Sequence, residues 1–216
     1  MSSIEKVRST IKSTEKTMKI TGAMELVAAS KLGKTQKHMA KTKPFSEKIL
    51  EVMGHIATSH SEYKHPFLID REKKKNIGFI VVSSDRGLCG SLNLNLFKEI
   101  MIKIKDIPKE NTKFCLIGNK ATSFFSRISK NIIGQKSHLG DRPSVTDTLG
   151  VVQVMLNAYL NEEVDTIYLC YNKFKSTIDP DSGIVSYLYW AISSDLSASE
   201  VIGTITFCQI DGLSEV

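Results

Sequence analysis

Apolar residues recur every three or four positions along the first 58 residues, with lysine and glutamate between them. This spacing is typical of an amphipathic α-helix, and the absence of proline from residue 3 to residue 43 lets the helix run without a break. Pro44 lacks a backbone N–H and is expected to kink or restart the helix. The sequence therefore predicts a long helix over residues 1–58, with a kink near residue 44.

The first part of this helix has the spacing of a coiled-coil seam. Ile4, Val7, Ile11 and Met18 follow one another at heptad-like intervals. A helix of about 40 residues is about 60 Å long, which exceeds the width of a small domain. If this apolar stripe stayed exposed, the helix would gain none of the free energy that burial of its apolar side chains provides. We therefore expect half of a coiled coil, covered by a second long helix or by other protein chains.

Residues 76–175 alternate between strand and helix patterns. The strands are short apolar runs, and the helices have apolar residues at a spacing of three to four. The expected elements are strands at 77–82, 113–117, 131–135 and 166–174, with helices at 94–104, 119–128 and 144–160. This alternation predicts an α/β fold, namely a Rossmann-like parallel sheet with helices on both faces.

Two further segments complete the expected organisation. Residues 59–75 are predicted to link the long helix to the α/β domain. Residues 176–216 contain six acidic residues and no lysine or arginine, which sets them apart from the rest of the chain. We expect an atypical tail there, outside the domain.

Composition excludes several classes of protein. With 216 residues, 41% of them hydrophobic and 24% charged, the chain can bury a core and is not disordered throughout. No apolar run approaches the roughly twenty residues of a membrane-spanning helix, and the polar start lacks a signal-peptide pattern. The net charge of +6 is uneven, because residues 1–75 carry 16 Lys and Arg against 8 Asp and Glu.

The candidate chemistry is sparse. The four cysteines form no C-x-x-C pair, and His55, His60 and His65 recur every five residues, which does not align two ligands on one helix face. The loop at residues 87–90, GLCG, matches neither the dinucleotide-binding nor the P-loop fingerprint. The sequence therefore predicts no catalytic residue, no cofactor and no metal site.

Four stretches resemble the gamma subunit of F-type, proton-translocating ATP synthases, and they occur in that family's order. They are ITGAMELVAASK at residues 20–31, HI at 55–56 followed by EYKHP at 62–66, VSSDRGLCGSLN at 82–93 and YNKF at 171–174. The resemblance covers residues 1 to about 175. Gly22 stands where many members of the family carry lysine.

The resemblance implies a fold and a function. The first helix would pair with a C-terminal helix to form the rotor shaft, inside a ring of alternating alpha and beta subunits. The α/β domain would sit beside the epsilon subunit on the c ring. Proton flow would turn the shaft and drive ATP synthesis in the ring, with this subunit itself non-catalytic. Its implied location is peripheral, on the cytoplasmic face of the bacterial inner membrane, or on the mitochondrial matrix face if a targeting segment was removed.

The resemblance also implies which residues contact the alpha/beta ring. They are Ile20, Met24, Val27 and Lys31 on the helix, and Arg86, Gly87 and Cys89 in the loop after the first strand. We expect Arg86 and the shaft lysines to attract acidic loops of the beta subunits, and Met24 to form an adaptable apolar contact. Gly87 and Gly90 are expected to permit the tight turn after the strand.

The end of the chain departs from the family. The family continues into a long C-terminal helix with a second signature, and residues 176–216 carry no such pattern. The composition break indicates a truncated or frame-shifted product, or an incomplete gene model. Two alternative functions remain open from the residues alone: a nucleic-acid-binding protein with a basic helical arm, or a small nucleotide-dependent α/β enzyme.

Overall fold

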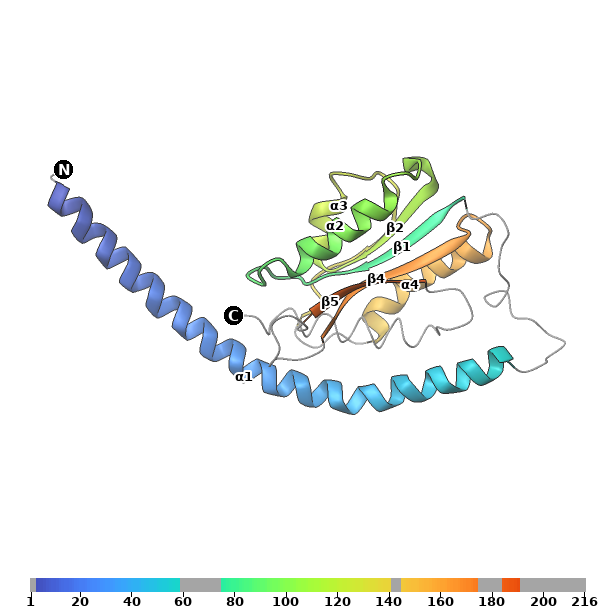
Figure 1. Cartoon of the computed structure of the whole chain (residues 1–216), viewed down its shortest axis with the longest axis horizontal. Helices are drawn as coiled ribbons and strands as arrows, with labels where there is room; N and C mark the ends of the chain where they lie inside the picture. The colour runs from blue at the N-terminus through green and yellow to red at the C-terminus, as the bar shows by residue number, and fades with distance from the viewer. Residues whose placement is uncertain (1–2, 59–74, 141–144, 175–183, 191–216) are drawn as a thin grey trace.

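The computed structural model describes residues 3–58, 75–140, 145–174 and 184–190. One very long helix is followed by a sheet with helices on both faces (Figure 1). The helices are α1 (Ser3–Thr58), α2 (Leu92–Ile104), the short 3₁₀ helix η2 (Lys109–Asn111), α3 (Asn119–Phe125) and α4 (Val145–Leu160). The strands are β1 (Ile77–Val82), β2 (Thr112–Ile117), β3 (Ile132–Lys136), β4 (Thr166–Phe174) and β5 (Ile184–Trp190).

The sheet has the strand order β3-β2-β1-β4-β5. The first four strands in this order pair in parallel, which confirms the predicted parallel α/β sheet. β5 pairs antiparallel with β4, from Tyr168 opposite Trp190 to Phe174 opposite Ile184. This strand lies within the segment expected to be a tail. A long connection between parallel strands requires a crossover, whereas an antiparallel strand can return directly along the edge.

The core has two layers, one on each face of the sheet. Successive side chains of a strand point to opposite faces, so Phe79 and Val81 of β1 pack with α2 and α3. Ile80 and Val82 pack with α4 on the other face. Figure 1 shows α2 and α3 on one side of the sheet and α4 on the other. Burial on both faces explains why β1 is a continuous apolar run rather than an alternating one.

The helices of the α/β domain differ from their expected bounds by a few residues. α3 ends at Phe125, three residues before the predicted end. The N–H groups of Arg127 and Ile128 donate to the carbonyl oxygens of Phe124 and Phe125, three residues earlier. These bonds between residues three apart tighten the chain into a turn and so end the α-helix. The residues that follow are themselves compatible with an α-helix.

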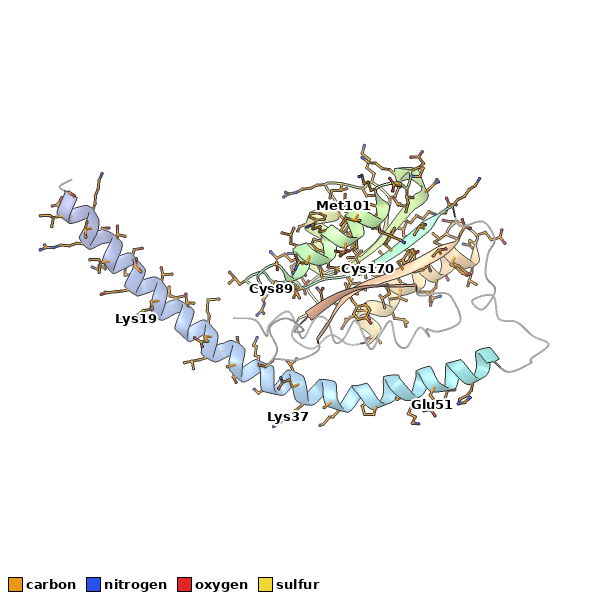
Figure 2. The ribbon with its side chains drawn as sticks, viewed as in Figure 1. Lys19, Lys37, Glu51, Cys89, Met101 and Cys170 are labelled. Atoms are coloured by element: carbon orange, nitrogen blue, oxygen red, sulfur yellow. The ribbon has the colours of Figure 1, made fainter. Side chains whose placement is uncertain are left out.

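α1 is continuous through Pro44, so the expected restart of the helix is not observed. The helix changes direction in the region of Lys37, as labelled in Figure 2. Proline at residue 44 clashes with the carbonyl of residue 40, one helical turn earlier, which accounts for a bend on the N-terminal side of the proline. In Figure 1 the N-terminal half of α1 extends away from the sheet. None of the helices that the structure describes is long and apolar enough to cross a membrane.

Candidate interaction surface

The loop between β1 and α2 projects from the carboxyl edge of the sheet, where Cys89 is labelled in Figure 2. Its first residue, Ser83, is fixed to the neighbouring strand and helix. The Ser83 hydroxyl donates to the carbonyl of Ile117 at 3.2 Å and accepts from the N–H of Ala121 at 2.8 Å. Gly118 has a φ of 94°, and a Cβ there would lie 2.1 Å from the Ser83 carbonyl oxygen. Only glycine fits this close crossing of two loops.

Asp85 ties three loops together. One oxygen of its carboxylate accepts from the N–H groups of Asn119 at 2.9 Å and His138 at 3.1 Å, and the other accepts from the N–H of Leu139 at 2.8 Å. Hydrogen bonds to a charged acceptor are stronger than neutral ones. The β1–α2 loop is therefore anchored to the loops that follow β2 and β3.

Cys89 lies inside the loop rather than on its surface, with 5% of its area exposed. The amide nitrogen of the buried Asn93 donates to the sulfur at 3.2 Å and to the hydroxyl of Ser84 at 2.8 Å. The Asn93 side-chain oxygen accepts from the N–H of Ser84 at 3.2 Å. These bonds close the loop on itself. Cys89 therefore shapes the loop from within, and its contact with the alpha/beta ring stays a prediction.

The tip of the loop is formed by three exposed residues, Arg86, Gly87 and Leu88. Leu88 has a φ of 65°, a conformation that side-chain-bearing residues other than Asn and Asp seldom adopt, and it is 73% exposed. Gly90 has a φ of 54°, as expected for a glycine in a tight turn. Gly87 is not in the left-handed region, so the turn does not depend on it. A Cβ at Gly87 would instead lie 3.3 Å from the Lys120 ammonium nitrogen.

The shaft residues of the prediction share one face of α1. Ile20, Met24, Val27 and Lys31 are spaced by four, three and four residues, which keeps them within about a 60° arc of the helix. The three apolar side chains are exposed, and Lys31 is half-buried. The structure thus groups the four residues into one stripe.

The earlier apolar residues form a second stripe. Ile4, Val7, Ile11 and Met18 are all exposed and lie about 160° around the helix from the first stripe. Between the two stripes lie four threonines whose hydroxyls donate to the carbonyl four residues earlier, at 2.9–3.0 Å. These threonines are Thr10, Thr14, Thr17 and Thr21. These hydroxyls are satisfied within the helix, so the surface between the two stripes presents no unpaired threonine donor.

A nucleotide site in an α/β sheet of this kind would lie at the switch point, where the order of the strands reverses. In a doubly wound sheet that point lies beyond the carboxyl ends of β1 and β4. There, the amide nitrogen of the buried Asn172 donates to the carbonyl of Leu92 at 3.2 Å, so β4 is joined directly to the start of α2. Within the described ranges, no group of His, Cys, Asp and Glu side chains could hold a metal ion.

Two of the cysteines, Cys115 and Cys170, are buried in the core, where their thiols are poorly reactive. Burial raises the pKa of the Cys115 thiol to about 12, and it also raises the pKa of Cys170. The thiolate is the reactive form of cysteine, so neither residue is suited to nucleophilic or redox chemistry at neutral pH.

Comparison with known proteins decides the family. The model of the family described as ATP synthase matches residues 3–199. The chain belongs to the ATP synthase gamma-chain family. The match continues past residue 175, where the resemblance was expected to end, and it includes β5.

Curated relatives agree with this assignment. The ATP synthase gamma chain of Legionella pneumophila strain Corby is 48% identical over 180 residues, which are 82% of this chain and 62% of the relative. The ATP synthase gamma chain of Coxiella burnetii strain RSA 493 is 45% identical with the same coverage. The chain therefore spans about three-fifths of the length of these relatives.

Two solved structures share the fold. A chain of the Tetrahymena thermophila mitochondrial ATP synthase, from a structure of the central stalk and c ring, has a TM-score of 0.60 at 16% identity, with 91% of this chain and 93% of that chain covered. A chain of the Euglena gracilis mitochondrial ATP synthase rotor has a TM-score of 0.59 at 13% identity, with 86% of this chain and 63% of that chain covered. The long helix with an attached α/β domain is thus common to all three.

The structure adds three residues that the sequence did not single out: Asp85, Leu88 and Lys120. Asp85 and Leu88 lie within the motif, but neither the inward position of the carboxylate nor a positive φ is visible in a sequence. Lys120 lies 34 positions after Arg86 and reaches the tip only because β1 and β2 are neighbours in the sheet. The predicted boundaries between helix, linker, domain and tail stay predictions.

Proposed function

We propose that this chain is the central-stalk rotor subunit of a proton-translocating ATP synthase. In this role it couples proton flow through the c ring to ATP synthesis in the alpha/beta ring. The observation that carries the proposal is the family match over residues 3–199, combined with 45–48% identity to gamma chains. The nucleic-acid and small-enzyme alternatives have no comparable support.

The arrangement of α1 suits a shaft that is enclosed by other subunits. Its two apolar stripes face nearly opposite directions and are exposed. At about 1.5–3 kcal/mol for each fully buried large side chain, the exposed stripes favour association with other chains. The stripe of Ile20, Met24, Val27 and Lys31 is the proposed contact with the alpha/beta ring, together with Arg86 and Gly87 in the loop.

The coupling works through differential contacts. A shaft that presents unlike surfaces in different directions contacts each beta subunit differently at each angle, and so stabilises a different conformation of that subunit. Arg86 supplies an electrostatic contact, and Met24 supplies an apolar contact that adapts as the surfaces slide. The catalytic chemistry is then carried by the alpha and beta subunits, and this chain is non-catalytic.

The proposed partners are the alpha and beta subunits, the epsilon subunit and the c ring. The solved structures that share the fold come from a central stalk with its c ring and from a rotor, which supports this set of partners. The proposed location is peripheral, on the cytoplasmic face of the bacterial inner membrane, with membrane contact only through the c ring.

Co-purification separates the candidate functions. A tagged full chain, expressed in its own cells and recovered from detergent-solubilised membranes, should carry alpha, beta, epsilon and c subunits. Recovery of nucleic acid or of a bound nucleotide, without these subunits, would support one of the two alternatives instead.

A pair of substitutions tests the proposed shaft face. Met24 lies on the proposed ring-facing stripe, whereas Leu26, two residues away and 74% exposed, lies outside it. Met24→Ala should lower the yield of co-purified alpha and beta subunits more than Leu26→Ala. Equal losses from the two variants would argue against the assignment of this face.

A further inference from the structure

The connection from α1 enters the α/β domain at the central strand of the described sheet. α1 ends at Thr58 and β1 begins at Ile77. β1 lies between β2 and β4 in the strand order β3-β2-β1-β4-β5. A force that passes along the chain between the long helix and the domain therefore reaches the sheet through residues 75 and 76, directly before β1.

Asp165 holds these two residues against the start of β4. One oxygen of its carboxylate, Oδ2, accepts from the N–H groups of Lys75 at 3.1 Å and Asn76 at 2.9 Å. In return, the N–H groups of Asp165 and Thr166 donate to the carbonyl of Asn76 at 2.8 Å and 3.3 Å. The regular ladder between β1 and β4 starts only at Ile77. The carboxylate thus extends the pairing of the two strands by two residues, on the side where the chain enters.

The end of α4 fixes Asp165 in turn. Glu162 has a φ of 61°, and the N–H groups of Glu163 and Val164 both donate to the carbonyl of Ala158, at 2.9 Å and 3.2 Å. Such bonds close a helix end into a tight turn. Val164 is fully buried beneath this turn. The carboxylate of Asp165 is therefore presented from a fixed part of the domain.

Close packing holds β1 directly after the point of entry. A Cβ at Gly78 would lie 2.5 Å from the sulfur of Met155 and 3.1 Å from a methyl carbon of Val164. Only glycine allows α4 and the turn after it to approach β1 this closely. The entry point is consequently held twice, by hydrogen bonds before the strand and by packing at its second residue.

We propose that Asp165 is a positioning residue that clamps the entry of the connection from α1 and so passes force between the shaft and the sheet. Without the carboxylate, residues 75 and 76 could separate from β4. At 3.3–3.6 Å per residue, their release would lengthen the connection by up to about 7 Å. A longer connection lets the domain turn farther relative to the shaft under the same load. This inference rests on the proposed rotor function and assigns to Asp165 a part in its mechanics.

Amide hydrogen exchange in the full chain tests whether the clamp holds. Asp165→Ala removes the acceptor, so exchange at the N–H of Asn76 should accelerate by about tenfold or more, the effect of losing a hydrogen bond to a charged group. Asp165→Asn keeps one acceptor oxygen for the two N–H groups and should restore most of the protection. Glu163→Ala is the matched control, because it removes a carboxylate that pairs with Lys113 at the same edge of the sheet.

Single-molecule rotation tests whether the clamp carries force. The full chain is assembled with surface-fixed alpha and beta subunits, a bead is attached to the α/β domain, and the bead's angle is recorded during the pauses between steps. Asp165→Ala should broaden the distribution of angles at each pause. Asp165→Asn should narrow it again, and Glu163→Ala should match the parent chain. A purely structural role would lower the yield of complex or the unfolding midpoint but leave the angles of the assembled molecules unchanged.

Each outcome decides a different claim. If the parent complex rotates and Asp165→Ala shows the angular distribution of the parent, the force-carrying role is overturned and the rotor function stands, whatever the exchange rates are. If exchange at Asn76 does not accelerate in Asp165→Ala, the clamp itself is overturned. If the parent complex assembles but does not rotate, the rotor function fails, and the mechanical role of Asp165 fails with it.

Discussion

Asp85 illustrates how one side chain can organise a whole edge of the sheet. Its two oxygens accept from the N–H groups of Asn119, His138 and Leu139, which lie at the start of α3 and in the loop after β3. Backbone N–H groups at loop crossings need acceptors, and a carboxylate can serve three at once. The exposed tip formed by Arg86, Gly87 and Leu88 is consequently held by hydrogen bonds between Asp85 and the neighbouring segments. Such anchoring suits a surface that has to withstand lateral force.

Replacing Asp85 with asparagine should destabilise this edge. Asparagine retains one acceptor oxygen but turns an NH₂ group toward the N–H of Leu139, so that two donors face each other. We expect Asp85→Asn to lower the free energy of unfolding by about 1.5–3 kcal/mol. Chemical denaturation measures this loss. Asp106→Asn, at an exposed turn, is the control and should change the free energy by less than about 0.5 kcal/mol. Equal stabilities for the two variants would show that the three hydrogen bonds contribute nothing.

The buried thiols make the free energy of unfolding depend on pH in the alkaline range. Burial raises the pKa of Cys115 to about 12 from its ordinary value of 9.0. From about pH 9 upward the unfolded chain releases a thiol proton that the folded chain keeps until about pH 12. The contribution is therefore fully present below pH 9 and is lost as pH rises through this window, by about 1.4 kcal/mol per pH unit.

Denaturation at a series of pH values checks this dependence. Lysines and tyrosines also titrate above pH 9, so the comparison is between the parent chain and Cys115→Ala. The slope of the free energy of unfolding against pH should be smaller in the variant by about 1.4 kcal/mol per pH unit. An unchanged slope would mean that the Cys115 thiol ionises in the folded chain as readily as in the unfolded one.

At the scale of elements, α1 differs from the other helices because, among the described residues, its side chains belong to neither layer of the core. α2, α3 and α4 each bury an apolar face against the sheet, whereas the large apolar residues of α1 up to Val27 are exposed. Most helical stability in proteins comes from packing of such a face. Until partner chains cover this surface, the helix content of α1 should therefore depend strongly on the intrinsic helix propensities of its residues.

Gly22 offers a direct test of this dependence. A Cβ added at Gly22 would meet no other atom within 4 Å, and the helix continues on both sides. Gly22→Ala should stabilise α1 by up to about 1 kcal/mol, which circular dichroism would record as higher helicity. The neighbouring Ala23→Gly should lower helicity by a similar amount. If both variants leave helicity unchanged, α1 is already held by contacts other than its own backbone.

The elements with the strongest local signals were predictable from the sequence. β1 and β4 have the predicted bounds, 77–82 and 166–174, because both are apolar runs bounded by polar or turn-forming residues. The bend in α1 followed from Pro44. β5 was not predicted, since an edge strand is defined by its pairing with β4, a contact that local periodicity does not reveal.

The candidate surface was only partly predictable. The motif identified the loop, and Arg86 and Gly87 are indeed exposed at its tip. The burial of Cys89 depends on the amide of Asn93, and the position of Lys120 depends on the pairing of β1 with β2. Residues that meet through tertiary structure leave no mark in the spacing of a single sequence.

At the scale of the whole molecule, a densely packed α/β domain is combined with a long helix whose apolar stripes are exposed. The domain supplies a rigid base with a charged loop at one edge, and α1 supplies a lever longer than the domain is wide. A rotor needs both features, because torque applied at the base has to reach surfaces that lie along the shaft. The central claim of this account is that the chain turns inside the alpha/beta ring.

Direct observation of rotation tests that claim. The full chain, labelled with a bead through an added tag, is assembled with alpha and beta subunits that are fixed to a glass surface, and ATP is supplied. The account predicts that the bead turns in one direction during ATP hydrolysis and stops when ATP is removed. A ring that incorporates the chain and hydrolyses ATP while the bead shows only undirected Brownian motion would contradict it.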